Sequence, residues 1–145
     1  MNELYVIEAE ASDWEEAIRL TAKVLIDQKA VKLDFAQSCI EREKEYPTGL
    51  NDQCPIAIPH TTSSHVNRDA IVLLRLKHAV PFHSMEDMDK VVNCRYVMNL
   101  ALVDDKTHIH FLSKLFNAFK DPNCIKKMDG CSNSELQKLM IKILN

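Results

Sequence analysis

The sequence predicts an α/β (mixed α+β) fold, a three-layer helix/sheet/helix sandwich with a mixed β-sheet and the element order β-α-α-β-β-β-α-α-α. The chain has 145 residues, the usual length of one domain with its own core. Hydrophobic residues make up 46% and charged residues 27%, an ordinary globular composition. Helical periodicity near both ends surrounds β-prone runs in the middle, a pattern typical of a sheet between helical layers. We therefore expect residues 1–145 to form a single domain.

The N-terminal third predicts one strand followed by two helices. Residues 4–7 (LYVI) are a short β-prone run. Ser12 is the expected helix N-cap, with Glu15 three residues further on, and apolar residues then recur at helical spacing to about Gln28. A second helix should follow, with a charged end at residues 41–45 and one apolar face formed by Phe35, Cys39 and Ile40.

A loop and three strands should occupy the middle of the chain. Pro47 and Gly49 break the second helix, and we expect Gly49 to be required for a positive φ. Residues 56–58 (IAI) look like a short buried strand that Pro59 closes. Stronger strand patterns cover residues 70–76 and 94–103, with Pro81, Phe82 and an acidic turn between them.

Three helices should complete the chain. An amphipathic helix is expected from Thr107, and two short helices are expected after the breaks at residues 121–122 (DP) and 129–130 (DG). The apolar positions of the helix that begins at Thr107 are Ile109, Leu112, Leu115, Phe116 and Phe119.

Charge and cysteine content exclude several classes of function. The chain carries 18 Lys and Arg against 21 Asp and Glu, without a single-sign run, so nucleic acid is not an expected partner. No stretch approaches the ~20 apolar residues of a membrane span, and the N-terminus lacks the basic region of a signal peptide. We expect a cytoplasmic protein with no direct membrane insertion. Its five cysteines are odd in number and widely spread, which predicts reduced thiols.

Histidine is the enriched reactive residue, with six copies at positions 60, 65, 78, 83, 108 and 110. A neutral imidazole is a nucleophile, and its ordinary pKa of ~6.5 leaves it largely neutral near pH 7. By itself, this chemistry leaves His60 open to a plain role as a hydrogen-bonded loop residue. A zinc site, or a zinc-dependent hydrolase, is a rival use of these residues. However, the spacing matches no standard zinc motif, and His108 and His110 should lie on different faces of a helix.

A family resemblance gives His60 a specific role. Residues 40–50 read IEREKEYPTGL and residues 56–61 read IAIPHT. This combination closely resembles the signature of the fructose/mannitol-type enzyme IIA domains of the bacterial phosphoenolpyruvate-dependent sugar phosphotransferase system (PTS). Phe82, Met85 and residues 100–109 agree as well, so the resemblance covers nearly the whole chain, which looks like one PTS EIIA type-2 domain. The YPTGL loop and the approach to it at residues 30–35 look most like the galactitol-type branch.

The resemblance implies roles for five site residues. His60 corresponds to the phosphorylated histidine, expected to react through the ring nitrogen farther from the backbone. His108 matches the second active-site histidine, which can donate to phosphoryl oxygens. Arg42 matches an arginine whose planar guanidinium suits phosphate oxygens. Thr48 and Thr61 are candidate phosphoryl-binding hydroxyls. His65, His78, His83 and His110 match no family role and are expected to be structural or on the surface.

The resemblance also implies partners and a mechanism. Phosphoryl transfer depends mainly on in-line positioning and charge stabilisation, so no cofactor, metal or ATP is expected. The expected donor is the phosphohistidine carrier HPr, the acceptor is a cysteine of the cognate IIB protein, and the IIC membrane subunit takes part indirectly. Both partners should dock on an apolar rim around His60. Candidates for that rim are Leu50, Pro55 and Ile58, with core packing favoured for Ile58. The alternative function is a regulatory IIA-like module whose phosphorylation state at His60 controls a partner protein.

Overall fold

The computed structural model describes residues 3–145 and contains the predicted order of elements. Its strands are β1 (Leu4–Ala9), β2 (Ile56–Ala57), β3 (Ala70–His83) and β4 (Val91–Ala101). Its α-helices are α1 (Trp14–Asp27), α2 (Phe35–Glu45), α3 (Asp105–Phe119), α4 (Cys124–Asp129) and α5 (Asn133–Leu144). A 3₁₀ turn at Ser63–His65 lies between β2 and β3.

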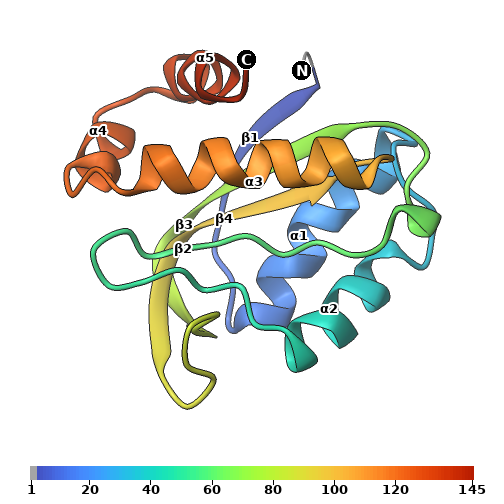
Figure 1. Cartoon of the computed structure of the whole chain (residues 1–145), viewed down its shortest axis with the longest axis horizontal. Helices are drawn as coiled ribbons and strands as arrows, with labels where there is room; N and C mark the ends of the chain where they lie inside the picture. The colour runs from blue at the N-terminus through green and yellow to red at the C-terminus, as the bar shows by residue number, and fades with distance from the viewer. Residues whose placement is uncertain (1–2) are drawn as a thin grey trace.

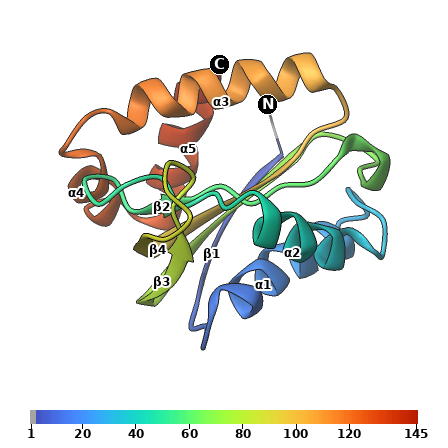
Figure 2. The same cartoon turned by 60° about the horizontal axis from the view of Figure 1, so that its bottom comes forward.

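The four strands form one mixed sheet in the order β1-β3-β4-β2. β1 runs parallel to β3, β3 runs antiparallel to β4, and β2 runs parallel to β4. Helices α1 and α2 cover one face of the sheet, and α3, α4 and α5 cover the other (Figures 1 and 2). This confirms the predicted three-layer sandwich.

Each face of the sheet has its own apolar core. Ile18, Leu25 and Phe35 from α1 and α2 pack with Val72 and Leu74 of β3 in the first core. The second core packs Leu115, Met128 and Met140 from α3, α4 and α5 against the opposite side of the sheet. Because successive side chains of a strand point to opposite faces, β3 contributes to both cores, and it reads as a nearly continuous apolar run. Among the helices of residues 3–145, none is both long enough and apolar enough to span a bilayer.

The two central strands are longer than predicted. β3 continues through Pro81 to His83 after a register shift between Arg75 and Val80. Pro81 lacks an N–H donor and was expected to lie between the strands. It is tolerated because β1 pairs with β3 only as far as Leu76, which leaves that side of β3 without a strand partner.

Two local predictions were wrong in their details. The N-cap of α1 is Asp13 rather than Ser12, since an Asp13 carboxylate oxygen accepts from the backbone N of Glu16 at 2.8 Å. Gly49 does not adopt a positive φ. Its requirement is space, because a Cβ at this position would lie 2.8 Å from the backbone oxygen of His83. The loop after α2 therefore packs against the β3–β4 hairpin with no room for a side chain.

Candidate functional site

His60 lies directly after β2 at the edge of the sheet. The short strand ends at Ala57, and Pro59 then accepts a hydrogen bond from the backbone N of Leu100 at 3.1 Å. His60 itself forms a parallel bridge with Leu100 of β4. This pairing ties the backbone of His60 to the central strand β4, although β2, the strand that precedes His60, is only two residues long.

The ring of His60 is oriented by its own backbone neighbour. Its Nδ1 lies 2.9 Å from the carbonyl oxygen of Ile58. Because a carbonyl only accepts, Nδ1 must carry the proton in this bond, and in the neutral ring the lone pair is therefore on Nε2. The ring of His108, from the first turns of α3, lies beside it with the two centroids 4.4 Å apart and a tilt of 57°.

These two histidines open into a small cavity of about 110 Å³. Arg42 from the last turns of α2 lines it, and its guanidinium lies over the ring of Tyr46 at 5.1 Å. The Nε of Arg42 is buried without a hydrogen-bond partner within residues 3–145. The structure therefore brings together three side chains that are 18 and 48 residues apart in sequence. The full lining consists of Arg42, His60, Thr61, Thr62, Ser63, Leu102, Asp105 and His108.

Burial keeps both histidine rings neutral. It lowers the pKa of His60 to about 4, with His108 and Arg42 adding to the shift and the bond to Ile58 opposing it. The pKa of His108 is also lowered, first by burial and then by Arg42, while Asp105 acts in the opposite direction. At pH 7 both imidazoles are thus neutral and share the cavity lining with the Arg42 guanidinium.

The two predicted threonines occupy different places. Thr61 lines the cavity, and its hydroxyl pairs with that of Ser38 on α2. Thr48 is buried outside the cavity lining, with its hydroxyl bonded to Glu43 and to the backbone N of Ile58. Thr48 therefore contacts the segment that precedes His60 and does not line the cavity.

Four lining residues were not predicted from the sequence: Thr62, Ser63, Leu102 and Asp105. Asp105 lies in the first turn of α3, where acidic residues are common for reasons of helix stability, so its type gave no signal of a site. Thr62 and Ser63 directly follow Thr61 in the loop, so the hydroxyl-rich run at residues 61–64 (TTSS) was the available signal.

The other four histidines lie outside the cavity lining. His65 pairs with Asp34 at 3.0 Å, and His78 lies 3.6 Å from Glu10. Nδ1 of His83 bonds to the carbonyl oxygen of Met88, and the His110 side chain lies on the exposed side of α3. Across residues 3–145, no three or more His, Cys, Asp or Glu side chains are grouped to hold a metal ion.

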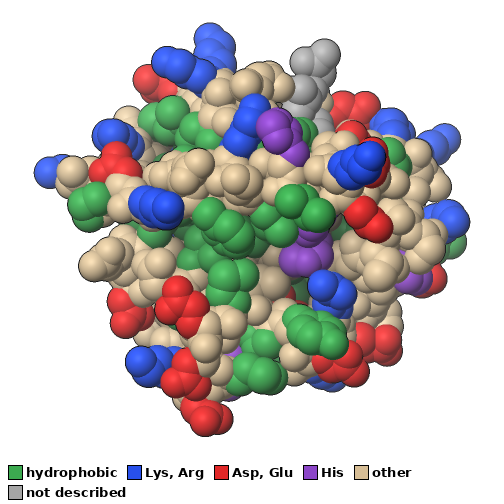
Figure 3. All heavy atoms as spheres, viewed as in Figure 1, with side chains coloured by type: hydrophobic (Ala, Val, Ile, Leu, Met, Phe, Trp, Pro, Cys, Tyr) green, Lys and Arg blue, Asp and Glu red, His purple; other side chains and the backbone are tan. Residues whose placement is uncertain are grey.

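Exposed apolar side chains adjoin the site. Figure 3 shows hydrophobic side chains gathered next to a histidine in the middle of the face that carries α3. Ile109 directly follows His108 and is 68% exposed, and Val103 directly follows Leu102 and is 45% exposed. Together with Tyr46 they form what we term the apolar rim. Leu50, which was predicted for the rim, is instead buried in the core, and Ile58 is buried there as well, which confirms the core packing favoured for it.

Known proteins with related sequences include the galactitol-specific EIIA component of the Escherichia coli K12 PTS. It is 28% identical over 131 residues, which cover 90% of this chain and 87% of that protein. The mannitol-specific EIICBA component of Vibrio cholerae is 32% identical over 121 residues, covering 81% of this chain and 18% of that longer protein.

Solved structures of related proteins share the fold. The complex of enzyme IIA^Mtl with phosphorylated enzyme IIB^Mtl from Escherichia coli contains a chain that matches with a TM-score of 0.77 and 26% identity, covering 97% of this chain and 94% of that one. The family model of the phosphoenolpyruvate-dependent sugar phosphotransferase system, EIIA 2, matches residues 1–142. The chain therefore belongs to the EIIA 2 family of the sugar phosphotransferase system, whose IIA components are phosphotransferases that work through a phosphohistidine intermediate.

Proposed function

We propose that this chain is a cytosolic phosphocarrier that accepts a phosphoryl group on Nε2 of His60 from phospho-HPr and passes it to a cysteine of a IIB protein. The observation that carries the proposal is the arrangement at His60. Its Nδ1–H donates to Ile58, and its ring lies beside that of His108 in a cavity that Arg42 also lines. A neutral imidazole held in one tautomer is suited to nucleophilic attack through the other nitrogen.

The two proposed transfers balance without a cofactor. In the first, the Nε2 lone pair attacks the phosphorus of the donor, and the bond from phosphorus to the donor nitrogen breaks with its electron pair remaining on that nitrogen. The His60 ring keeps its Nδ1 proton, and the Ile58 carbonyl stabilises the positive charge that develops on the ring. In the second, a cysteine thiolate attacks the phosphorus and the P–Nε2 bond breaks, which returns His60 to its neutral form.

Arg42 and His108 are the proposed partners of the phosphoryl oxygens. The buried Nε–H of Arg42 has no partner within the described chain and is available to a phosphoryl oxygen. The first turn of α3 reaches the cavity through Asp105 and His108, so the positive end of the helix dipole also favours an anion there. Thr61 is a further candidate donor, since it lines the cavity and its hydroxyl proton is free when Ser38 is the donor in their shared bond. These groups would stabilise charge that spreads over the oxygens during transfer.

The apolar rim is the proposed docking surface for HPr and the IIB protein in turn. A carrier must release each partner quickly, which suits a modest interface around the histidine. The IIC membrane subunit would be served indirectly through IIB. The galactitol-specific EIIA component is among the related proteins, which supports a polyol or sugar of that kind as the transported substrate.

The test of the proposal is phosphorylation with phosphoenolpyruvate, enzyme I and HPr. Wild type should gain one acid-labile phosphate, and His60→Ala should gain none. An unphosphorylated wild type, or a phosphorylated His60→Ala, would overturn the proposal. For His108→Ala we expect slower transfer to IIB by at least about tenfold, because one donor to the phosphoryl oxygens is lost. Equal rates in wild type and His108→Ala would remove His108 from the mechanism.

A further inference from the structure

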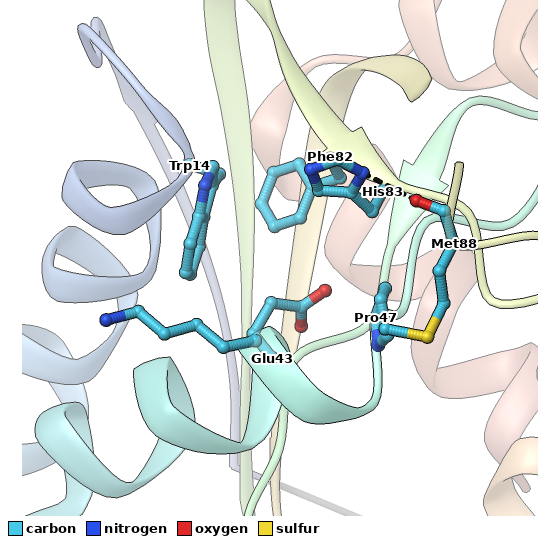
Figure 4. A pocket seen from close by; sticks show the side chains of 7 residues that line it. Trp14, Glu43, Pro47, Phe82, His83 and Met88 are labelled. Carbon is cyan, nitrogen blue, oxygen red and sulfur yellow. Dashed lines mark hydrogen bonds between the residues drawn. The ribbon is translucent and has the colours of Figure 1, made fainter. Parts of the chain in front are cut away.

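Glu43 is a buried carboxylate that lies outside the cavity lining around His60. It is 6% exposed, and Figure 4 shows it extending from α2 into a second cavity walled by Trp14, Pro47 and Phe82. Both oxygens of the Glu43 side chain accept hydrogen bonds from Thr48. Oε2 accepts from the backbone N of Thr48 at 2.6 Å, and Oε1 accepts from the Thr48 hydroxyl at 2.8 Å. Burying a carboxylate is costly, and the two bonds from Thr48 offset part of that cost. Both bonds need acceptor oxygens, so Glu43 clamps Thr48 in its ionised form, which is favoured above its pKa of about 7.

Thr48 connects this clamp to the segment that carries His60. Its Oγ1 accepts from the backbone N of Ile58 at 3.1 Å, and its carbonyl oxygen lies 3.3 Å from the same nitrogen. The carbonyl of Ile58 in turn accepts from Nδ1 of His60 at 2.9 Å. One continuous series of hydrogen bonds therefore runs from Glu43 through Thr48 and Ile58 to the imidazole.

The last bond in this series decides which nitrogen of His60 is the nucleophile. A neutral imidazole has two tautomers, and the nitrogen without the proton is the one that can attack. The Ile58 carbonyl selects the tautomer only if it is held in place. Ile58 lies between the β2–β4 pairing at Ile56 and Ala57 and the bridge of His60 with Leu100. Its own N–H is bonded to Thr48 and not to β4, so Thr48 is the contact that holds Ile58 itself.

We infer that Thr48, clamped by Glu43, is a positioning residue for the phosphoryl transfer: it holds the Ile58 carbonyl so that His60 keeps its proton on Nδ1 and presents Nε2. The inference rests on the proposed function of His60. It replaces the predicted role of Thr48 as a phosphoryl-binding hydroxyl, because the Thr48 hydroxyl is already engaged with Glu43 and Ile58.

The decisive variant is Thr48→Val, which keeps the shape of the side chain and removes the hydroxyl. Thr48→Ser restores the hydroxyl and serves as the rescue. Thr21→Val is the matched control, because Thr21 is also fully buried, with its hydroxyl donating to the Ile18 carbonyl and accepting from Asn99. Both valine variants lose one donated and one accepted bond, so both should lose similar stability.

Two measurements separate positioning from stability. Ring ¹⁵N NMR shifts of unphosphorylated His60 report its tautomer, and rapid-quench kinetics report the first-order transfer rate within the complex with phospho-HPr. We expect wild type, Thr48→Ser and Thr21→Val to hold the proton on Nδ1. Thr48→Val should show a mixture of tautomers and a transfer rate about tenfold lower, the effect of one lost hydrogen bond, with little change in affinity for HPr.

The outcomes distinguish this inference from the proposed function. A Thr48→Val protein with the wild-type tautomer and transfer rate would overturn the inference, even when wild type is phosphorylated on His60. A wild type that gains no phosphate would overturn the proposed function, while the tautomer measurement would still test the role of Thr48. If Thr48→Val does not fold, the same NMR measurement is made on Thr48→Ala, and an unchanged tautomer there also overturns the inference.

Discussion

Glu43 and His60 are buried titratable residues whose pKa values move in opposite ways for the same reason. Burial disfavours the charged form, so it raises the pKa of Glu43 to about 7 and lowers the pKa of His60 to about 4. In the folded chain Glu43 therefore keeps its proton up to a higher pH than in the unfolded chain, where the carboxyl group titrates near its ordinary pKa. The stability that Glu43 contributes is fully present below pH ~4.5 and is lost as pH rises toward 7, whereas the His60 contribution is lost as pH falls from ~6.5 toward 4.

Replacing Glu43 by glutamine tests the first of these effects. The amide stays neutral, so Glu43→Gln should gain about 2–3 kcal/mol of unfolding free energy relative to wild type between pH 5 and pH 8. Urea unfolding of both proteins at the two pH values measures this difference, and the His60 contribution cancels in the comparison. A difference that does not change with pH would show that Glu43 ionises in the fold as it does in water.

The two glycines of the chain provide a matched pair for a second test. A Cβ at Gly49 would lie 2.8 Å from the His83 carbonyl, whereas one at Gly130 would meet no heavy atom closer than 3.6 Å. Gly49→Ala should therefore lower the unfolding free energy by about 1–3 kcal/mol through overpacking. Gly130→Ala should change it by less, or raise it by about 0.4–1 kcal/mol through the unfolded state. Equal effects in chemical denaturation would contradict this explanation of Gly49.

At the scale of the element, helix α1 shows how a capping residue can be misassigned by one position. Ser12 and Asp13 are adjacent and both are good N-caps, and each has a glutamate three residues later. The structure selects Asp13, which has an extended backbone and accepts from the N of Glu16, while the Ser12 hydroxyl only donates to the Glu16 side chain. Sequence spacing alone did not separate the two candidates.

The difference between these two residues is measurable. Asp13→Ala removes the cap and should lower the unfolding free energy by about 1 kcal/mol. Ser12→Ala removes only an exposed side-chain contact and should stay within about 0.5 kcal/mol of wild type. Thermal unfolding of the two variants measures this difference. A larger loss of unfolding free energy in Ser12→Ala than in Asp13→Ala would show that Ser12 is the N-cap.

At the scale of the whole molecule, the apolar rim and the far end of the β3–β4 hairpin make a second matched pair. Ile109 is 68% exposed beside His108, and Val91 is 47% exposed at the opposite end of β4 from Leu100. Val91 and Leu100 are nine positions apart along the strand, which is a distance of roughly 30 Å. Both side chains can therefore be changed to a charge without disturbing a core, but only one lies near His60.

Ile109→Asp should weaken docking, because a partner would have to desolvate a carboxylate at the rim. We expect kcat/KM for transfer to IIB to fall about tenfold, with the transfer rate inside the complex unchanged. Val91→Asp should leave both parameters at wild-type values. Equal losses in the two variants, or a loss in Val91→Asp alone, would place the docking surface away from the rim.

The order of the elements, the family resemblance and the candidate residues His60, Arg42 and His108 could all be predicted from the sequence. Periodicity over long segments indicates local structure and burial, and short motifs indicate chemistry, so both can be recognised in a sequence alone. How those residues are arranged around one cavity became visible in the folded chain alone. The pairing of His60 with Leu100 brings α3 to the site, and the hydrogen bond between Thr48 and Ile58 is the basis of the inferred positioning role of Thr48. Hydrogen bonds between segments that are distant in sequence produce no periodic pattern of residue types. They depend on which segments the fold brings together, and the local sequence around each residue does not encode this.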